Sequence, residues 1–283
     1  MKIFLLGCGF VGKKLAQNFG ELGHEVVGWV RSNDSALELR GLGVSPLIGD
    51  FTEESSWGAL PHDFDLAIHI ASSGRGDVAV YEKVYLEGMR RLAAHLPKAR
   101  LFFVSSTSVY GQIDGAIVDE SSETNPSTAT SQVLLKAEQI ALEKGGIVVR
   151  PSGIYGPQRS ILFQKFLEGT AVIEGEGNRW VNQIHRDDVA GGITFLIENN
   201  HRSGIFNLTD QRPSNHMEIY QWLAQKTGKP LPPYAAENHQ RKRGWTHKRI
   251  SSQKLQTLGW RLKFPTFEEG YSSFLGAQSV GGR

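Results

Sequence analysis

The chain of 283 residues has one cysteine, Cys8, and no long apolar run. A single cysteine cannot form an intramolecular disulfide, so we expect a reducing compartment, the cytoplasm. The apolar run at residues 3–6 is shorter than the ~7–15 residues of a signal-peptide core. No segment approaches the ~18 consecutive apolar residues of a membrane span. The sequence therefore predicts neither export nor a membrane partner.

An excess of charge of one sign is also absent, since 31 basic and 29 acidic residues give a net charge of +2. We therefore expect no nucleic-acid partner. Residues 238–267 nevertheless contain eight Lys or Arg and no Asp or Glu. This stretch is either a solvated basic face or a site for a phosphorylated small molecule. The second interpretation rests on Arg241, Lys242, Arg243, Lys248 and Arg249.

Metal-binding patterns are missing as well. The nine histidines include no HxH, HxxH or HxxxH spacing, so no metal site is predicted. The pair Asp187-Asp188 precedes a helical pattern and is interpreted as a helix cap rather than a metal site. His185, just before it, is interpreted as a structural histidine at the end of a strand.

Short apolar runs alternate with helical patterns through the first half of the chain. Val11, Leu15, Phe19 and Leu22 recur at helical spacing, and Gly23 stands where a C-terminal cap belongs. This alternation is typical of parallel β/α units and predicts an α/β fold. We expect strands at residues 3–6, 25–30, 66–70, 101–104, 147–149, 180–184 and 205–207, and helices at 10–22, 131–144 and 188–198.

A glycine-rich loop joins the first expected strand to the first expected helix. Gly7, Gly9 and Gly12 form a GxGxxG pattern in the context of a dinucleotide-binding turn, where Phe10 and Val11 open the helix. The helix N-terminus offers unpaired N–H groups to a pyrophosphate. Lys14 stands where a P-loop needs Ser or Thr, which disfavours a nucleotide triphosphatase. The alternative is a glycine turn that only packs strand against helix.

The residue after the second expected strand bears on the choice of cofactor. Arg31-Ser32 stands where a carboxylate would accept hydrogen bonds from the ribose 2′-hydroxyl of NAD. Arginine suits a 2′-phosphate instead, so we expect NADP, with NAD as the alternative. Asp34 is the nearby residue that could reverse this preference.

Several further motifs occur together. The chain carries Gly49-Asp50, DLAIHIA at 65–71, VSSTSVYG at 104–111, RPSGIYGP at 150–157, IHRDDVA at 184–190 and LGW at 258–260. With the glycine loop, these motifs resemble those of the extended short-chain dehydrogenases/reductases of the NAD-dependent epimerase/dehydratase family, in an atypical branch. The resemblance spans nearly the full length.

The resemblance implies a Rossmann-like doubly wound parallel sheet and a smaller, discontinuous C-terminal substrate domain. The expected boundaries are 1–158 for the dinucleotide domain, with 180–210 returning to it, and 159–179 and 211–283 for the substrate domain. By motif match Asp50 would approach the adenine, with Phe51 beside it. The other implied cofactor contacts are Ile70, Ala71 and Ser72 after the fourth strand and Ser105 near the nicotinamide.

The family's chemistry relies on a Tyr-x-x-x-Lys pair and an upstream serine, and no Tyr-x-x-x-Lys occurs in this chain. Ser106 matches the serine. If Lys136 is the lysine, Gln132 stands in the tyrosine's place. In the other register, Thr130 replaces the tyrosine and Leu134 the lysine. We name Ser106 and Lys136 as catalytic candidates.

Two functions follow as alternatives. The first is an atypical NAD(P)-dependent oxidoreductase or epimerase with a small-molecule substrate, in which Tyr85, Tyr110 or Tyr155 is a candidate by residue type for the missing tyrosine. The second is a non-catalytic NADP(H)-binding sensor. Homodimer formation is left open by the sequence.

Overall fold

The computed structural model describes residues 1–74, 76–239 and 245–278. Its contacts divide the chain into two units, each made of several segments. Unit 1 consists of Met1–Val109, Pro126–Arg150 and Ala190–Phe206, and unit 2 of Tyr110–Asn125, Pro151–Val189 and Asn207–Arg283.

Unit 1 is built around a seven-stranded sheet in the order β12-β7-β5-β4-β1-β2-β3. Neighbouring strands from β3 through β7 pair in parallel. The order reverses at β1, so β1 and β4 form the switch point at which open α/β sheets bind ligands. The strands are β1 (Lys2–Leu6), β2 (Glu25–Val30), β3 (Ser45–Ile48), β4 (Leu66–His69), β5 (Arg100–Val104), β7 (Ile147–Pro151) and β12 (Gly204–Leu208).

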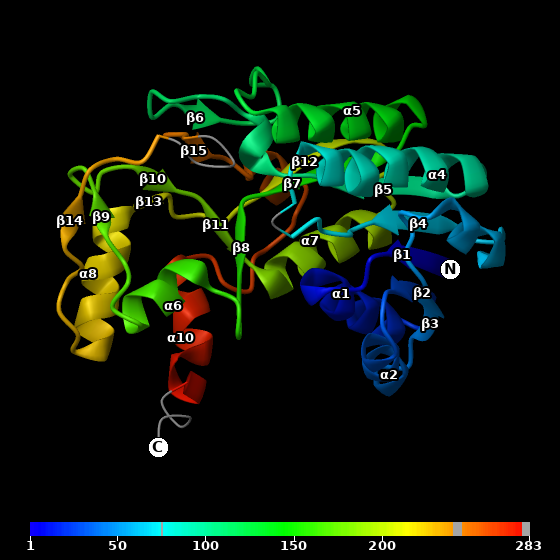
Figure 1. Ribbon diagram of the computed structural model, residues 1–283, viewed down its shortest axis with the longest axis horizontal. Coiled ribbons are helices and arrows are strands. Elements are labelled where there is room, and N and C mark those ends of the chain that lie inside the picture. Colours follow the sequence, from blue (N-terminus) through cyan, green and yellow to red (C-terminus); the bar gives the residue numbers. More distant parts are fainter. Residues whose placement is uncertain (75, 240–244, 279–283) are drawn as a thin grey trace. The chain divides into compact units, whose positions relative to one another are not determined.

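Helices cover both faces of this sheet. Figure 1 shows α4 and α5 on one side and α1 and α7 on the other. Each helix turns an apolar stripe to the strands; α1, for example, buries Val11, Leu15, Ala16 and Phe19. The helical elements are α1 (Phe10–Glu21), α2 (Asn33–Gly41), η1 (Glu54–Ala59), α3 (Val78–Tyr81), the π-helical turn η2 (Glu82–Glu87), α4 (Gly88–His95), η3 (Thr107–Val109), α5 (Ala129–Glu143) and α7 (Arg186–Glu198). The predicted Rossmann-like doubly wound sheet is confirmed.

Unit 2 contains four two-stranded sheets. They pair β6 (Ile117–Val118) with β15 (Arg249–Ile250), β8 (Gly153–Tyr155) with β11 (Gln183–His185), β9 (Ile173–Glu174) with β14 (Tyr234–Ala235), and β10 (Trp180–Val181) with β13 (Ser214–Asn215). An aromatic core that includes Phe163, Phe166, Tyr220, Phe267 and Tyr271 joins its longer helices. The helices are α6 (Ile161–Leu167), α8 (His216–Thr227), α9 (Gln253–Thr257) and α10 (Phe267–Gln278).

The unit boundaries differ from the expected ones in two places. Residues 180–185 do not return to the large sheet, because β10 pairs with β13 and β11 pairs with β8. Of the later segments only Ala190–Phe206 returns to unit 1, whereas Tyr110–Asn125, Pro151–Val189 and Asn207–Arg283 group with unit 2. The sequence showed apolar runs but not their pairing partners, so the expected segment 180–210 was too long.

Among the described residues, no helix is long and apolar enough to span a membrane.

Candidate functional site

The glycine loop occupies the turn between β1 and α1. Gly7 has φ +98°, and a Cβ there would lie 2.4 Å from the Cα of Ala71. A Cβ on Gly12 would lie 2.6 Å from the carbonyl oxygen of Gly7. Gly9 is different, because a Cβ there would meet no atom within 4 Å. The fold itself requires two of the glycines, whereas the third faces open space, as an approaching pyrophosphate would require.

The N-terminus of α1 fits an anion. Gly9 is its N-cap and offers no side chain, and the first turn holds no acidic residue. The amide N–H groups of this turn therefore point at the open side of the loop with a favourable dipole. Cys8 takes no part in chemistry here, because burial raises the pKa of its thiol to about 12.

Arg31 and Ser32 lie at the exposed end of β2. Ser32 caps α2 by accepting a hydrogen bond of 3.3 Å from the amide of Ser35. Arg31 has no hydrogen bond or ion pair within the described residues, so its guanidinium is available to a ligand. Asp34 lies exposed in the first turn of α2.

Asp50 is exposed after β3 and accepts hydrogen bonds from the amide and hydroxyl of Thr52, at 2.9 and 2.8 Å. Burial acts to raise the pKa of Asp50, but these hydrogen bonds and the positive charges of Arg31 and Lys83 outweigh it and hold the pKa below its usual value. Asp50 therefore lies within the field of Arg31. Phe51 is buried, with its ring edge-on to Trp29 and His69. Its side chain is part of the core, so only its backbone faces outward.

The residues after β4 lie next to the glycine loop. The amide of Ile70 donates to the carbonyl of Leu6, and Ala71 is the residue that a side chain at position 7 would strike. Ser72 is exposed, and its hydroxyl accepts from the amide of Gly74. The structure thus brings Ile70, Ala71 and Ser72 together with the glycine loop, at the sheet's switch point.

Ser105 has a different role from the one the motif suggested. It is buried, and its hydroxyl donates to a carboxylate oxygen of Glu138 at 2.5 Å. That carboxylate is also paired with Arg150, through hydrogen bonds of 3.0 and 2.6 Å. The hydroxyl is therefore committed to a buried ion pair. The sequence analysis did not predict this network. The position of Glu138 on the apolar side of an expected helix could have indicated that its carboxylate has a buried partner.

Ser106 is half-buried at the end of β5. Its oxygen accepts the amide N–H of Ser108 at 3.1 Å, which leaves its hydroxyl hydrogen for another acceptor. Ser108 in turn accepts from Ser131 at the start of α5, at 3.0 Å. Ser106 thus stands where a substrate oxygen could be bound.

The two catalytic candidates differ in burial, since Lys136 is exposed and Ser106 is half-buried. Lys136 is exposed on α5, as is Gln132, whereas Thr130 and Leu134 are on the buried side of the same helix. Thr130 and Leu134 are therefore the pair that faces the sheet. In this register they stand in place of the family's tyrosine and lysine. Helical periodicity places Lys136 on the exposed face of α5, away from Thr130 and Leu134, which argues against a catalytic role for Lys136.

The candidate tyrosines differ in what their hydroxyls do. In unit 2, Tyr110 donates to Asn207 at 2.9 Å, and Tyr155 is buried against Gly270. Burial is the main reason that the pKa of Tyr155 lies far above its usual value. In unit 1, the oxygen of Tyr85 accepts the amide N–H of Ser73 at 3.3 Å.

The Asp187-Asp188 pair is not a helix cap. Asp188 accepts the amides of Lys263 and Phe264, at 2.5 and 3.1 Å, and so fixes a distant loop. Asp187 is ion-paired with Arg186. His185 is buried, with Nδ1 accepting the amide of Asp187. The described residues contain no group of three His, Cys, Asp or Glu that could hold a metal ion.

Lys248 and Arg249, the two described residues among the five offered for a phosphorylated molecule, are both engaged by the protein itself. The Lys248 ammonium is buried and donates to the carbonyl of Tyr110, and burial lowers the pKa of Lys248 to about 8. Arg249 donates to the carbonyl of Gly115 and lies 5.3 Å from the ring centre of Trp180. Arg241, Lys242 and Arg243 lie outside the described residues.

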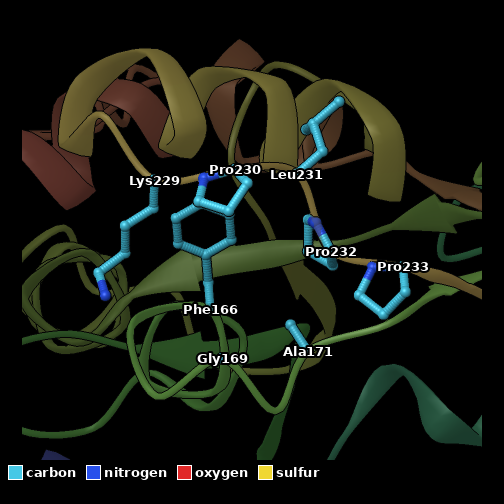
Figure 2. A pocket seen from close by; sticks show the side chains of 8 residues that line it. All are labelled: Phe166, Gly169, Ala171, Lys229, Pro230, Leu231, Pro232 and Pro233. Carbon is cyan, nitrogen blue, oxygen red and sulfur yellow. The ribbon is translucent and has the colours of Figure 1, made fainter.

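Unit 2 also has a shallow pocket of about 220 Å³ (Figure 2). Its walls are the ring of Phe166, the small residues Gly169 and Ala171, and the segment from Lys229 to Pro233. Lys229 is the one ionisable side chain among these eight residues. None of the expected site residues lines this pocket, so it is not the candidate active site.

Comparison with known proteins identifies the class. A model of the NAD dependent epimerase/dehydratase family matches residues 3–209, and the chain belongs to this family. The resemblance predicted from the motifs is thereby confirmed.

Relatives agree with this assignment. The chain is 28% identical over 243 residues to protein YeeZ of Escherichia coli K12, covering 82% of this chain and 86% of YeeZ. A solved structure from Methylobacillus flagellatus, reported as an NAD-dependent epimerase/dehydratase, has a TM-score of 0.81 at 29% identity, covering 98% of each chain. The UDP-glucuronic acid 4-epimerase of Bacillus cereus, solved with UDP-glucuronic acid and NAD, shares the fold with a TM-score of 0.81 at 20% identity, covering 96% of this chain and 97% of that one.

Proposed function

We propose that this chain binds NADP in unit 1 and acts as an oxidoreductase or epimerase of atypical type on a small-molecule substrate. The observation that carries the proposal is the open face above Gly9, together with the unpaired guanidinium of Arg31 at the end of β2. Family membership and the NAD held by solved relatives support a nicotinamide dinucleotide.

A different group of residues would bind each part of the cofactor. The amides of the first turn of α1 would hold the pyrophosphate, and Arg31 and Ser32 the 2′-phosphate. Asp50 would accept from the adenine amino group, and Ile70, Ala71 and Ser72 would line the ribose and nicotinamide side. A bound nicotinamide dinucleotide supplies hydride transfer, and Ser106 would hold the substrate oxygen.

A second candidate function is a sensor that binds NADP(H) without turnover. The buried positions of Thr130 and Leu134, where the family has tyrosine and lysine, favour it. The sensor and the enzyme share the same cofactor site, so binding alone does not separate them.

The test has two stages. Calorimetric titration with NADPH, NADP, NADH and NAD should give binding that is tightest for the phosphorylated forms. A panel of small aldehydes, ketones and secondary alcohols, followed by the absorbance of the reduced cofactor, then separates the functions. Turnover with any member identifies an oxidoreductase; binding without turnover across the panel favours the sensor over an oxidoreductase.

A further inference from the structure

The long helical segment from Val78 to His95 contains a π-helical turn. The turn η2 lies between α3 and α4 with no break in the chain direction. Single π-turns within α-helices cost stability and are concentrated at functional sites. The π-helical turn therefore points to a functional role for a side chain that it positions.

His69, at the end of β4, is bonded to this turn. Its Nε2 donates to the carbonyl of Val84 at 2.8 Å. In an α-helix that carbonyl would accept the amide of Gly88, but here the Gly88 amide bonds to the carbonyl of Tyr85. A Cβ on Gly88 would lie 2.7 Å from Nε2, so glycine makes room for the imidazole.

The turn places Tyr85. Its ring stacks on His69 with centroids 6.0 Å apart, and packs edge-on to Phe103 of β5 at 6.4 Å. Its oxygen accepts the amide N–H of Ser73. Ser73 belongs to the loop that begins with Ala71. Gly7 of the glycine loop packs against Ala71. Tyr85 thus reaches the loop that flanks the proposed cofactor site, and it contacts Phe103, which precedes Ser106 by three residues in the sequence.

Two features suit the Tyr85 hydroxyl to proton transfer. Its hydrogen meets no acceptor among the described residues, and the Ser73 hydroxyl beside it is buried without a partner there. An N–H that donates to the phenol oxygen stabilises negative charge on it. In the family a lysine has this task, and here Leu134 stands in that lysine's place.

We propose that Tyr85, on η2, is the proton donor and acceptor that replaces the tyrosine missing from α5. The proposal rests on the proposed function, since it requires a nicotinamide dinucleotide beside the loop at residues 71–74. The helices are suitably placed, because η2 packs directly on α5.

Reduction of a carbonyl substrate requires one hydride and one proton. A bound reduced nicotinamide dinucleotide would supply a hydride to the carbonyl carbon, and the Tyr85 hydroxyl would give its proton to the carbonyl oxygen. The phenolate that remains is held by the N–H of Ser73 and regains a proton from water. In the oxidation of a secondary alcohol, the Tyr85 oxygen would take the hydroxyl proton, and the oxidised nicotinamide would accept the hydride from the carbon.

The test uses tyrosinate absorbance across a pH titration of the intact chain saturated with NADP. We expect one tyrosine of the wild type to ionise below the usual value of about 10, since the cationic nicotinamide stabilises the phenolate. Tyr85→Phe should bind NADP within about twofold of the wild type and lack this step. Tyr81→Phe, which alters the neighbouring buried ring, should keep it.

The outcomes separate the two proposals. If calorimetry shows no NADP binding to the wild type, the proposed function fails. If NADP binds but wild type and Tyr85→Phe titrate identically, the assignment of Tyr85 is overturned while the cofactor site stands. If Tyr85→Phe does not fold, Tyr85→3-fluorotyrosine replaces it: the step must then move to lower pH, and an unmoved step overturns the assignment.

Discussion

Glu138 of α5 and Arg150 of β7 form a buried ion pair, joined by hydrogen bonds of 3.0 and 2.6 Å, and Ser105 donates to the same carboxylate. Both side chains are almost fully enclosed, with exposed fractions of 3% and 4%. The pair ties the helix that carries Thr130 and Leu134 to the central sheet. It therefore fixes the face of α5 turned toward the proposed site.

Removing one side chain of the Glu138–Arg150 ion pair should lower the free energy of unfolding. Glu138→Ala leaves the Arg150 guanidinium buried without its carboxylate, which typically costs about 3–5 kcal/mol. Urea unfolding followed by circular dichroism should show this loss in the free energy of unfolding. Gln139→Ala, next along the helix and exposed, should change it by less than about 0.5 kcal/mol. A loss below 1 kcal/mol for Glu138→Ala would mean that the pair is solvated.

Two glycines of the loop should respond differently to alanine. Gly7→Ala places a Cβ 2.4 Å from the Ala71 backbone at φ +98°, so the variant should be markedly less stable. Gly9→Ala meets no protein atom within 4 Å, so it should fold normally and bind NADP(H) at least ~10-fold more weakly. Thermal unfolding and calorimetry measure the two effects. Normal cofactor affinity of Gly9→Ala would contradict the location of the pyrophosphate.

The glycine loop, the parallel strands and the helix after β1 could be predicted because they depend on local patterns. Gly7 and Gly12 occupy positions of the turn where a side chain would strike the backbone, and the apolar spacing of α1 fixes its buried face. The family motifs added the expected positions of Asp50 and Ser106. These parts of the fold require little knowledge of distant contacts.

Other features depend on residues far apart in the sequence. In the π-turn that carries Tyr85, the Val84 carbonyl accepts a hydrogen bond from His69, which lies fifteen residues earlier in the chain. Two pairs on α5, Gln132 with Lys136 and Thr130 with Leu134, could occupy the positions of the family's tyrosine and lysine. Only the packing of α5 on the sheet shows which pair is buried. The pairing of Gln183–His185 with Gly153–Tyr155 likewise appears only in the folded chain. No local pattern encodes these partners.

His69 should make stability depend on pH. Burial lowers the pKa of His69 to about 4, against about 6.5 when unfolded. Between these values the unfolded chain binds a proton that the folded chain does not, so stability falls as pH is lowered through this window. The difference of about 2.5 units corresponds to about 3 kcal/mol. The loss is complete near pH 4.

His69→Gln keeps an N–H donor for Val84 and removes the titration. Its free energy of unfolding, measured by urea at several pH values, should fall by about 3 kcal/mol less than that of the wild type between pH 6.5 and 4. His62→Gln, at an exposed histidine, should follow the wild type. Parallel curves for His69→Gln and wild type would show that the buried imidazole accepts a proton without cost.

The central claim is that Arg31 binds the 2′-phosphate of NADP, and calorimetric titration of wild type and Arg31→Ala with NADPH and NADH tests it most directly. The wild type should bind NADPH more tightly, and Arg31→Ala should lose about 10- to 100-fold in affinity for NADPH, or ~1.4–3 kcal/mol, with little change for NADH. Arg40→Ala, at the exposed end of α2, should match the wild type. Absence of binding, or an unchanged ratio of affinities in Arg31→Ala, would contradict the claim.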